Sequence, residues 1–88
     1  MKEIIIDCRD FISRSDLHRI FAAALSFPDH YGNNLDALHD CLSEIGDTTL
    51  RMNHWNTAEQ LLGRYACCTR RAIEDAAADN VHLTVIFD

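Results

Sequence analysis

The sequence predicts an α/β fold in which three parallel strands form a small sheet flanked by four helices. Short runs of β-branched residues stand near the beginning, middle and end of the 88-residue chain, and two helical segments separate each run from the next. Strands that are separated by helices pair in parallel through right-handed crossovers. The expected order is therefore β-α-α-β-α-α-β, and the length predicts a single domain over residues 1–88.

The first half of the chain contains one predicted strand and two predicted helices. Residues 3–7 form a short segment rich in β-branched side chains, which is typical of a buried strand. Ser15 is placed to cap the first helix, whose apolar residues recur at helical spacing until Pro28 ends it. Asn33 or Asn34 can cap the second helix.

The second half of the chain contains two further helices and two further strands. Residues 48–52 are predicted to form the second strand. Asn56 can cap a short helix that ends before Gly63, and a longer helix is expected over residues 64–78. Residues 81–87 are expected to form the third strand, because this segment is rich in β-branched side chains.

The distribution of charge is more informative than the net charge of −6. The acidic balance argues against nucleic acid as a partner, because phosphate binding needs Lys and Arg. Residues 20–50 contain five acidic side chains and residues 72–88 contain four, and neither segment contains Lys or Arg. All of the uncompensated negative charge therefore lies in these two segments.

The N-terminus and the cysteines indicate where the protein acts. The first apolar run has three residues, whereas a signal peptide needs about 7–15 and a membrane-spanning helix about 20. The four cysteines form no CxxC pair and no clear disulfide framework. We therefore expect reduced thiols, a cytoplasmic protein without a membrane partner, and a monomer when the protein is free.

A stripe of carboxylates lies on the second predicted helix. Asp36, Asp40 and Glu44 recur at i, i+4 and i+8, so they share one face of the helix. Like charges at this spacing destabilise a helix by about 0.2–0.5 kcal/mol per pair, and Glu44 lies toward the negative end of the helix dipole. A solvated helix face is the simplest interpretation, but the single sign of the charge favours a surface that steers a basic partner.

The same helix allows two other interpretations. Asp36, His39 and Asp40 could bind a metal ion, or could act beside Cys41 in a small enzyme. No second cluster at ligand spacing supports a metal, and Cys41 rotates toward the apolar side of the helix, as a structural thiol would. We expect no cofactor and no enzymatic activity. The remaining histidines away from this region are expected to be structural or surface residues: His18, His54 and His82.

Several segments carry a resemblance to a known family: Tyr31-Gly32, Asn34-Leu35-Asp36-Ala37-Leu38, Asp40-Cys41-Leu42, Ser15-Asp16-Leu17-His18 and Leu83-Thr84-Val85-Ile86. They resemble the signature of barstar, the family of intracellular ribonuclease inhibitors. The similarity runs over nearly the whole chain. It implies a three-stranded parallel sheet with flanking helices, in agreement with the prediction from the residues themselves.

The resemblance also implies that the second helix and the loop before it plug the active site of a small basic, barnase-like ribonuclease. It assigns the central role to Asp40, as a stand-in for the RNA phosphate, and pairs Asp36 with a second basic group. Asp75 matches a carboxylate of the last helix, although the adjacent Glu74 could take its place. The loop and the helix start match further contact positions: His30, Gly32, Asn34 and Leu35. Two residues of the second helix complete the predicted partner-binding set: His39 and Glu44.

The chain departs from the best-known member of the family, which has aromatic residues at the positions of His30, His39 and Ile45. An alternative function is therefore an interaction protein that reuses this fold to bind a different basic protein. Tyr31 either packs in the core or joins the binding surface. If His30 and His39 face a cationic partner, their protonation should weaken binding below about pH 6.5.

Overall fold

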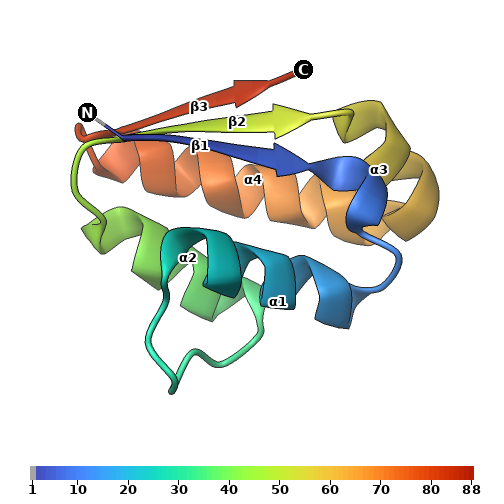
Figure 1. Ribbon diagram of the computed structural model, residues 1–88, viewed down its shortest axis with the longest axis horizontal. Coiled ribbons are helices and arrows are strands. Elements are labelled where there is room, and N and C mark those ends of the chain that lie inside the picture. The colour runs from blue at the N-terminus through green and yellow to red at the C-terminus, as the bar shows by residue number, and fades with distance from the viewer. Residues whose placement is uncertain (1) are drawn as a thin grey trace.

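The computed structural model describes residues 2–88 and shows a three-stranded sheet with its helices on one side (Figure 1). The strands β1 (Lys2–Asp7), β2 (Thr48–Asn53) and β3 (Leu83–Phe87) pair in parallel in the order β1-β2-β3. Right-handed crossovers that step across a sheet in one direction place their helices on the same face. The α/β fold and the order of elements predicted from the sequence are confirmed.

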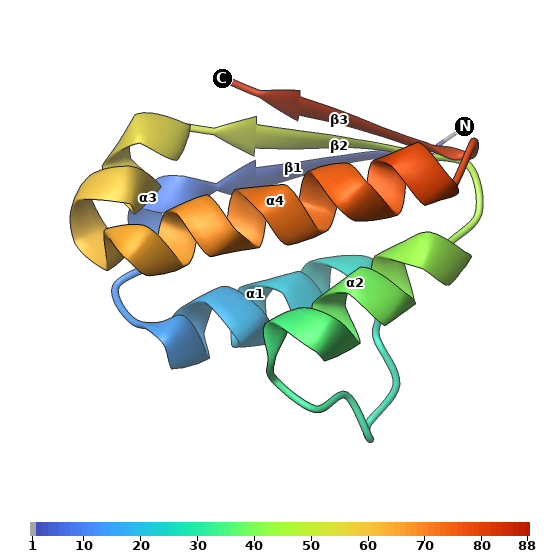
Figure 2. The ribbon, with the colours of Figure 1, turned by 180° about the vertical axis from the view of Figure 1, so that it is seen from behind.

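Within residues 2–88, four α-helices and one short 3-10 helix, η1 (Cys8–Asp10), connect the strands. The α-helices are α1 (Arg14–Leu25), α2 (Leu35–Glu44), α3 (Trp55–Leu62) and α4 (Arg64–Asp79). Helix α1 contacts β1 and α4 contacts β3, whereas α2 packs against α4. Helix α2 therefore lies at the outside of the helical layer, with one face open to solvent (Figure 2).

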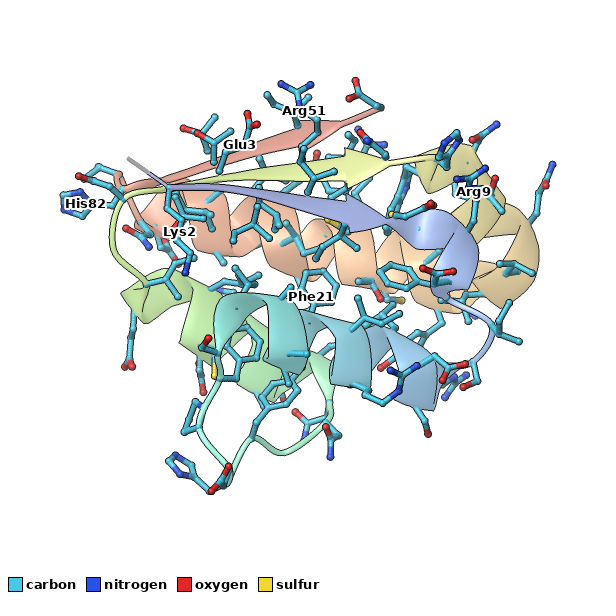
Figure 3. The ribbon with its side chains drawn as sticks, viewed as in Figure 1. Lys2, Glu3, Arg9, Phe21, Arg51 and His82 are labelled. Carbon is cyan, nitrogen blue, oxygen red and sulfur yellow. The ribbon has the colours of Figure 1, made fainter. Side chains whose placement is uncertain are left out.

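The core lies between the sheet and the helices that cover it. Apolar side chains of every layer contribute to it, and the largest fully buried ones include Phe11, Leu17, Phe21, Leu38, Leu42, Leu50, Met52 and Ile73. Phe21 of α1 lies between its helix and the sheet (Figure 3). Complete burial of one such side chain contributes about 1.5–3 kcal/mol, so these contacts fix the helices on the sheet.

The first helix begins earlier than predicted. Ser13, and not Ser15, is the N-cap, because its hydroxyl accepts a hydrogen bond of 3.2 Å from the backbone N–H of Asp16. An N-cap side chain reaches the third helical residue, and Ser13 and Asp16 have this spacing. The prediction that Ser15 caps the helix was therefore wrong by two residues.

The third helix also begins before its predicted cap. Asn56 lies inside α3, which starts at Trp55, and His54 precedes it in the left-handed conformation without a side-chain capping bond. Trp55 is buried and packs edge-on against Phe87, with ring centroids 5.0 Å apart. Tertiary packing of Trp55 accounts for this start, and the prediction that Asn56 is the cap was wrong.

No helix covers the outer face of the sheet in the described part of the chain (Figure 1). Ile6 on the inner face is 2% exposed, whereas Ile5 on the outer face is 58% exposed. The first strand is therefore buried on one face only, which corrects the expectation of a buried strand. Arg51 lies on the outer face, 3.9 Å from Glu3 and 3.1 Å from Asp88 (Figure 3).

The third strand is shorter than predicted because its first two residues form a turn. β3 begins at Leu83, and Val81 in the preceding turn is 91% exposed. Within residues 2–88, no helix has the length and apolar character needed to cross a membrane.

Candidate functional site

The start of α2 is fixed by one of its two predicted caps. Asn34 is the N-cap: its side-chain oxygen accepts a hydrogen bond of 2.8 Å from the backbone N–H of Ala37. Its amide nitrogen donates to the carbonyl oxygen of Gly32 at 3.3 Å, while Asn33 takes a left-handed backbone conformation. These bonds join the preceding loop to the first turn of α2.

The predicted carboxylate stripe lies on the exposed face of α2. Asp36, Asp40 and Glu44 are exposed, and the side chain of Asp40 is 81% accessible. Within residues 2–88, none of the three has a Lys or Arg at ion-pair distance. Several arginines instead pair with carboxylates elsewhere: Arg9 with Asp7, Arg19 with Asp16, Arg51 with Glu3 and Asp88, and Arg70 with Glu74. The stripe on α2 is therefore available to a cation from another molecule.

His39 connects this stripe to α4. One ring nitrogen lies 3.6 Å from an oxygen of Asp40, and the other lies 3.6 Å from an oxygen of Asp79 at the end of α4. The imidazole is partly exposed between these two carboxylates. The imidazole therefore bridges the stripe on α2 and the end of α4.

The structure separates the two acidic candidates of the last helix. Glu74 pairs with Arg70 at 3.5 Å, and the Arg70 guanidinium lies over the ring of Phe87 in β3. Asp75 precedes Asp79 by one helical turn, so these two share a face of α4, and that face meets α2 through His39. Asp75 is thus the residue of the pair that shares a helix face with Asp79, the contact of His39.

A hollow of about 400 Å³ lies between the loop before α2 and the helix itself. Its lining combines apolar side chains such as Phe27 with the carboxylates of Asp40 and Glu44. His30 and Gly32 of the loop line the same hollow, whereas Asn34 and Leu35 line a neighbouring one. Carboxylates next to apolar surface suit a flat cation, because a guanidinium or imidazolium donates charge-assisted hydrogen bonds while its plane packs on the apolar lining.

Tyr31 packs in the core and supports the loop from inside. It is 8% exposed, and its hydroxyl lies 2.6 Å from Nδ1 of the buried His18. Nε2 of His18 lies 2.6 Å from the hydroxyl of Tyr65 in α4. The network joins α1, the loop and α4, and burial lowers the pKa of His18 and raises the pKa of Tyr31. A neutral imidazole, which donates through one nitrogen and accepts through the other, matches both tyrosines.

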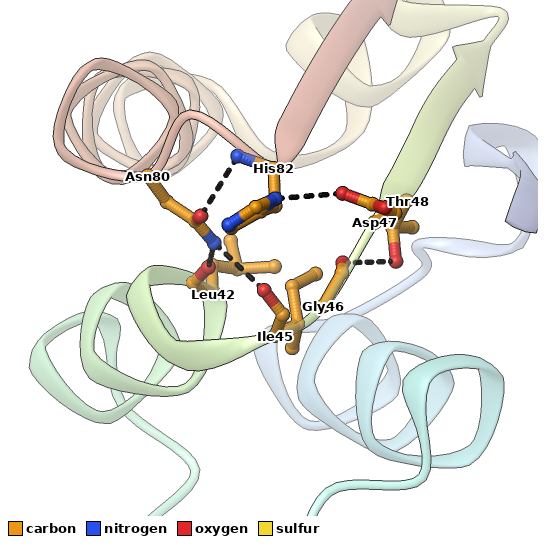
Figure 4. A network of polar contacts seen from close by, with 7 residues as sticks. All are labelled: Leu42, Ile45, Gly46, Asp47, Thr48, Asn80 and His82. Carbon is orange, nitrogen blue, oxygen red and sulfur yellow. Dashed lines mark hydrogen bonds and ion pairs between the residues drawn. The ribbon is translucent and has the colours of Figure 1, made fainter. Parts of the chain in front are cut away.

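The other end of α2 is held by a residue that the sequence indicated only as a helix stop. Asn80 follows α4 and is 6% exposed. Its amide nitrogen donates to the carbonyl oxygens of Leu42 at 2.9 Å and Ile45 at 3.0 Å (Figure 4). Its side-chain oxygen accepts a bond of 3.0 Å from the backbone N–H of His82. Nothing in the local sequence shows these contacts, because they join segments far apart in the chain.

The thiol near the stripe is poorly suited to nucleophilic chemistry. Burial, followed by the negative charges of Glu44 and Asp40, raises the pKa of Cys41, and a thiol reacts through its deprotonated form. Burial also raises the pKa of Cys8 to about 12. Across residues 2–88, no three His, Cys, Asp or Glu side chains are placed to hold a metal ion together.

Known proteins match this chain over most or all of its length. A family model described as "Barstar (barnase inhibitor)" matches residues 1–88. A protein of Bacillus subtilis (strain 168) named "Putative ribonuclease inhibitor YrdF" is 42% identical over 78 residues, covering 86% of this chain and 86% of that protein.

Proposed function

The chain belongs to the barstar family, and on this premise we propose that it inhibits a small, basic, barnase-like ribonuclease. In this proposal the protein performs no catalysis of its own. It binds the enzyme with α2 and the preceding loop and thereby blocks access of RNA to the active site.

The proposed mechanism replaces RNA phosphates with carboxylates. A ribonuclease holds the phosphate with cationic groups, and these groups form strong charge-assisted hydrogen bonds with carboxylate oxygens as well. Asp40 would take the place of the phosphate, and Asp36 would pair with a second cation. Asp75 would contribute from α4, because it lies on the face of that helix that meets α2. His30 would contact the enzyme from the loop.

The observation that carries this proposal is that the stripe on α2 has no Lys or Arg partner within the described residues. Asp36, Asp40 and Glu44 repel one another along the helix, and no Lys or Arg in residues 2–88 forms an ion pair with them. A surface selected for stability alone would mix charges of both signs. The unfavourable arrangement is understandable when a basic partner supplies the missing positive charge on binding.

The test is an inhibition assay with matched charge variants. Purified protein is titrated into a barnase-like ribonuclease and RNA cleavage is followed. The D36N and D40N substitutions together should abolish inhibition. The D10N and E59Q substitutions together are the control, because they remove the same number of negative charges from exposed side chains of η1 and α3. Inhibition that survives the paired D36N and D40N substitutions would refute the mechanism.

The same assay also distinguishes the function from the alternative. If the wild-type protein inhibits no ribonuclease of its source organism, the inhibitory function is refuted. Recovery of a basic protein other than a ribonuclease, in a complex that D36N and D40N disrupt, would support an interaction protein that reuses this fold.

A further inference from the structure

The described contacts of α2 show that a residue outside the helix holds its C-terminal turn. We propose that Asn80 is a positioning residue for the inhibitory helix, keeping Asp40 and Glu44 in the geometry that the target enzyme binds. This inference rests on the proposed inhibitory role of α2. It concerns a residue that lies outside both the helix and the loop.

The C-terminal turn of α2 is weakly supported by its own sequence. The helix has ten residues, and isolated helices shorter than about 12–15 residues are marginal in water. Its last turn contains no basic residue, and Glu44 lies where the helix dipole disfavours negative charge. The C-cap residue Ile45 is extended rather than left-handed, so the common glycine-type cap is absent at this end.

The Asn80 carboxamide supplies hydrogen-bond donors to the C-terminal turn of α2, which has no cap of its own. Its two amide hydrogens bond to the carbonyl oxygens of Leu42 and Ile45, and its oxygen accepts from the backbone of His82 (Figure 4). The last carbonyl oxygens of a helix have no hydrogen-bond donor within the helix. A buried side-chain donor can satisfy them in place of water. Because Asn80 joins α4 to β3, these bonds fix the end of α2 relative to the sheet.

The two ends of α2 are held independently. Asn34 caps the start of the helix and Tyr31 anchors the loop before it. Loss of the Asn80 bonds should therefore loosen the C-terminal half, which carries Asp40 and Glu44. The net charge stays the same, so electrostatic steering of the encounter should be preserved. The complex should form at the normal rate and dissociate faster.

The same polar network offers a matched control. The ring of His82 lies 2.7 Å from a carboxylate oxygen of Asp47, and both side chains are largely exposed (Figure 4). The contact of Asn80 with His82 involves only the backbone N–H of His82 and not its ring. His82→Ala therefore removes a side-chain contact two residues from Asn80 and leaves every bond of Asn80 to α2 in place.

The experiment compares Asn80→Ala with His82→Ala by two measurements at a temperature where both variants are fully folded. Binding kinetics with a barnase-like ribonuclease should show about tenfold faster dissociation for Asn80→Ala and an association rate within about twofold of wild type. Amide hydrogen exchange should be faster at residues 42–45 of this variant and unchanged in α1. His82→Ala should match the wild type in both measurements.

Equal changes in the two variants, or unchanged exchange at residues 42–45 in Asn80→Ala, would overturn the inference. If Asn80→Ala does not fold, Asn80→Gln retains the carboxamide on a longer side chain, and the same selective increase in exchange is expected. If the wild-type protein inhibits no ribonuclease, the proposed function fails. The exchange comparison then still decides whether Asn80 holds α2.

Discussion

The buried contact between Tyr31 and His18 allows a quantitative prediction about the loop before α2. Tyr31→Phe removes one hydroxyl and leaves the ring in place. The lost bond is 2.6 Å long and lies in the core, where His18 is 1% exposed. One ring nitrogen of His18 then has no partner, and water cannot reach it easily. An unsatisfied buried polar group costs about 1–3 kcal/mol.

The structure provides a matched substitution at the other nitrogen of the same imidazole. Tyr65→Phe removes the hydroxyl that lies 2.6 Å from Nε2 of His18 and keeps the ring beneath the Arg14 guanidinium. Tyr65 is only partly buried, so solvent can replace its hydroxyl. We expect the loss here to be close to the net value of an ordinary hydrogen bond, about 0.5–1.5 kcal/mol.

Urea unfolding followed by circular dichroism at pH 7.5 measures both losses. Tyr31→Phe should lower the free energy of unfolding more than Tyr65→Phe, with an unchanged dependence on urea. The melting temperature should fall by about 4–8 °C for each kcal/mol lost. The reasoning is refuted if Tyr31→Phe changes the free energy of unfolding by less than about 0.5 kcal/mol, or if Tyr65→Phe costs more.

Two further predictions concern pH and capping. Burial lowers the pKa of His18, so the unfolded chain binds more protons below about pH 6.5 and stability should fall as pH falls. Urea midpoints at pH 7.5 and 5.5 measure this loss, and equal midpoints would contradict it. Asn34→Ala should destabilise the protein by about 1 kcal/mol through loss of the α2 cap, in contrast to Asn33→Gly, because Asn33 caps no helix and glycine adopts its left-handed conformation without strain.

The fold was predictable from the sequence because it depends on local patterns. The helical spacing of Leu17 with Phe21 and of Leu38 with Leu42, together with the β-branched runs, identifies the elements without any long-range information. The burial of the first strand was overestimated, because the pattern at Ile5 does not show that the outer face of the sheet lacks a covering layer.

The errors in helix starts have two different physical causes. Ser13 and Ser15 are chemically equal caps two residues apart, and the local sequence does not distinguish them. Asn56 has the better capping side chain, but packing of Trp55 on Phe87 decides where α3 begins. Local preference is overridden there by a contact with the far end of the chain.

Some features of the candidate site were predictable from the local sequence, and others depend on contacts between distant segments. The exposed stripe on α2 follows from helical periodicity, so the sequence located it. The supports of that helix depend on contacts between distant segments, such as His18 with Tyr31 and Asn80 with Leu42, and no local pattern shows these. The contact of Asp79 with His39 likewise depends on how α4 packs against α2, whereas the pair of Arg70 and Glu74 is a local i, i+4 contact within α4.

In the proposed complex, the carboxylates of α2 occupy the place of RNA phosphate in the enzyme. The most direct measurement is the apparent dissociation constant of the complex at increasing concentrations of a short, non-cleavable oligonucleotide. Because the two ligands should exclude each other, the apparent dissociation constant is expected to rise in proportion to the oligonucleotide concentration once the enzyme is saturated with the oligonucleotide. An unchanged constant, together with a complex that holds both ligands at once, would contradict it.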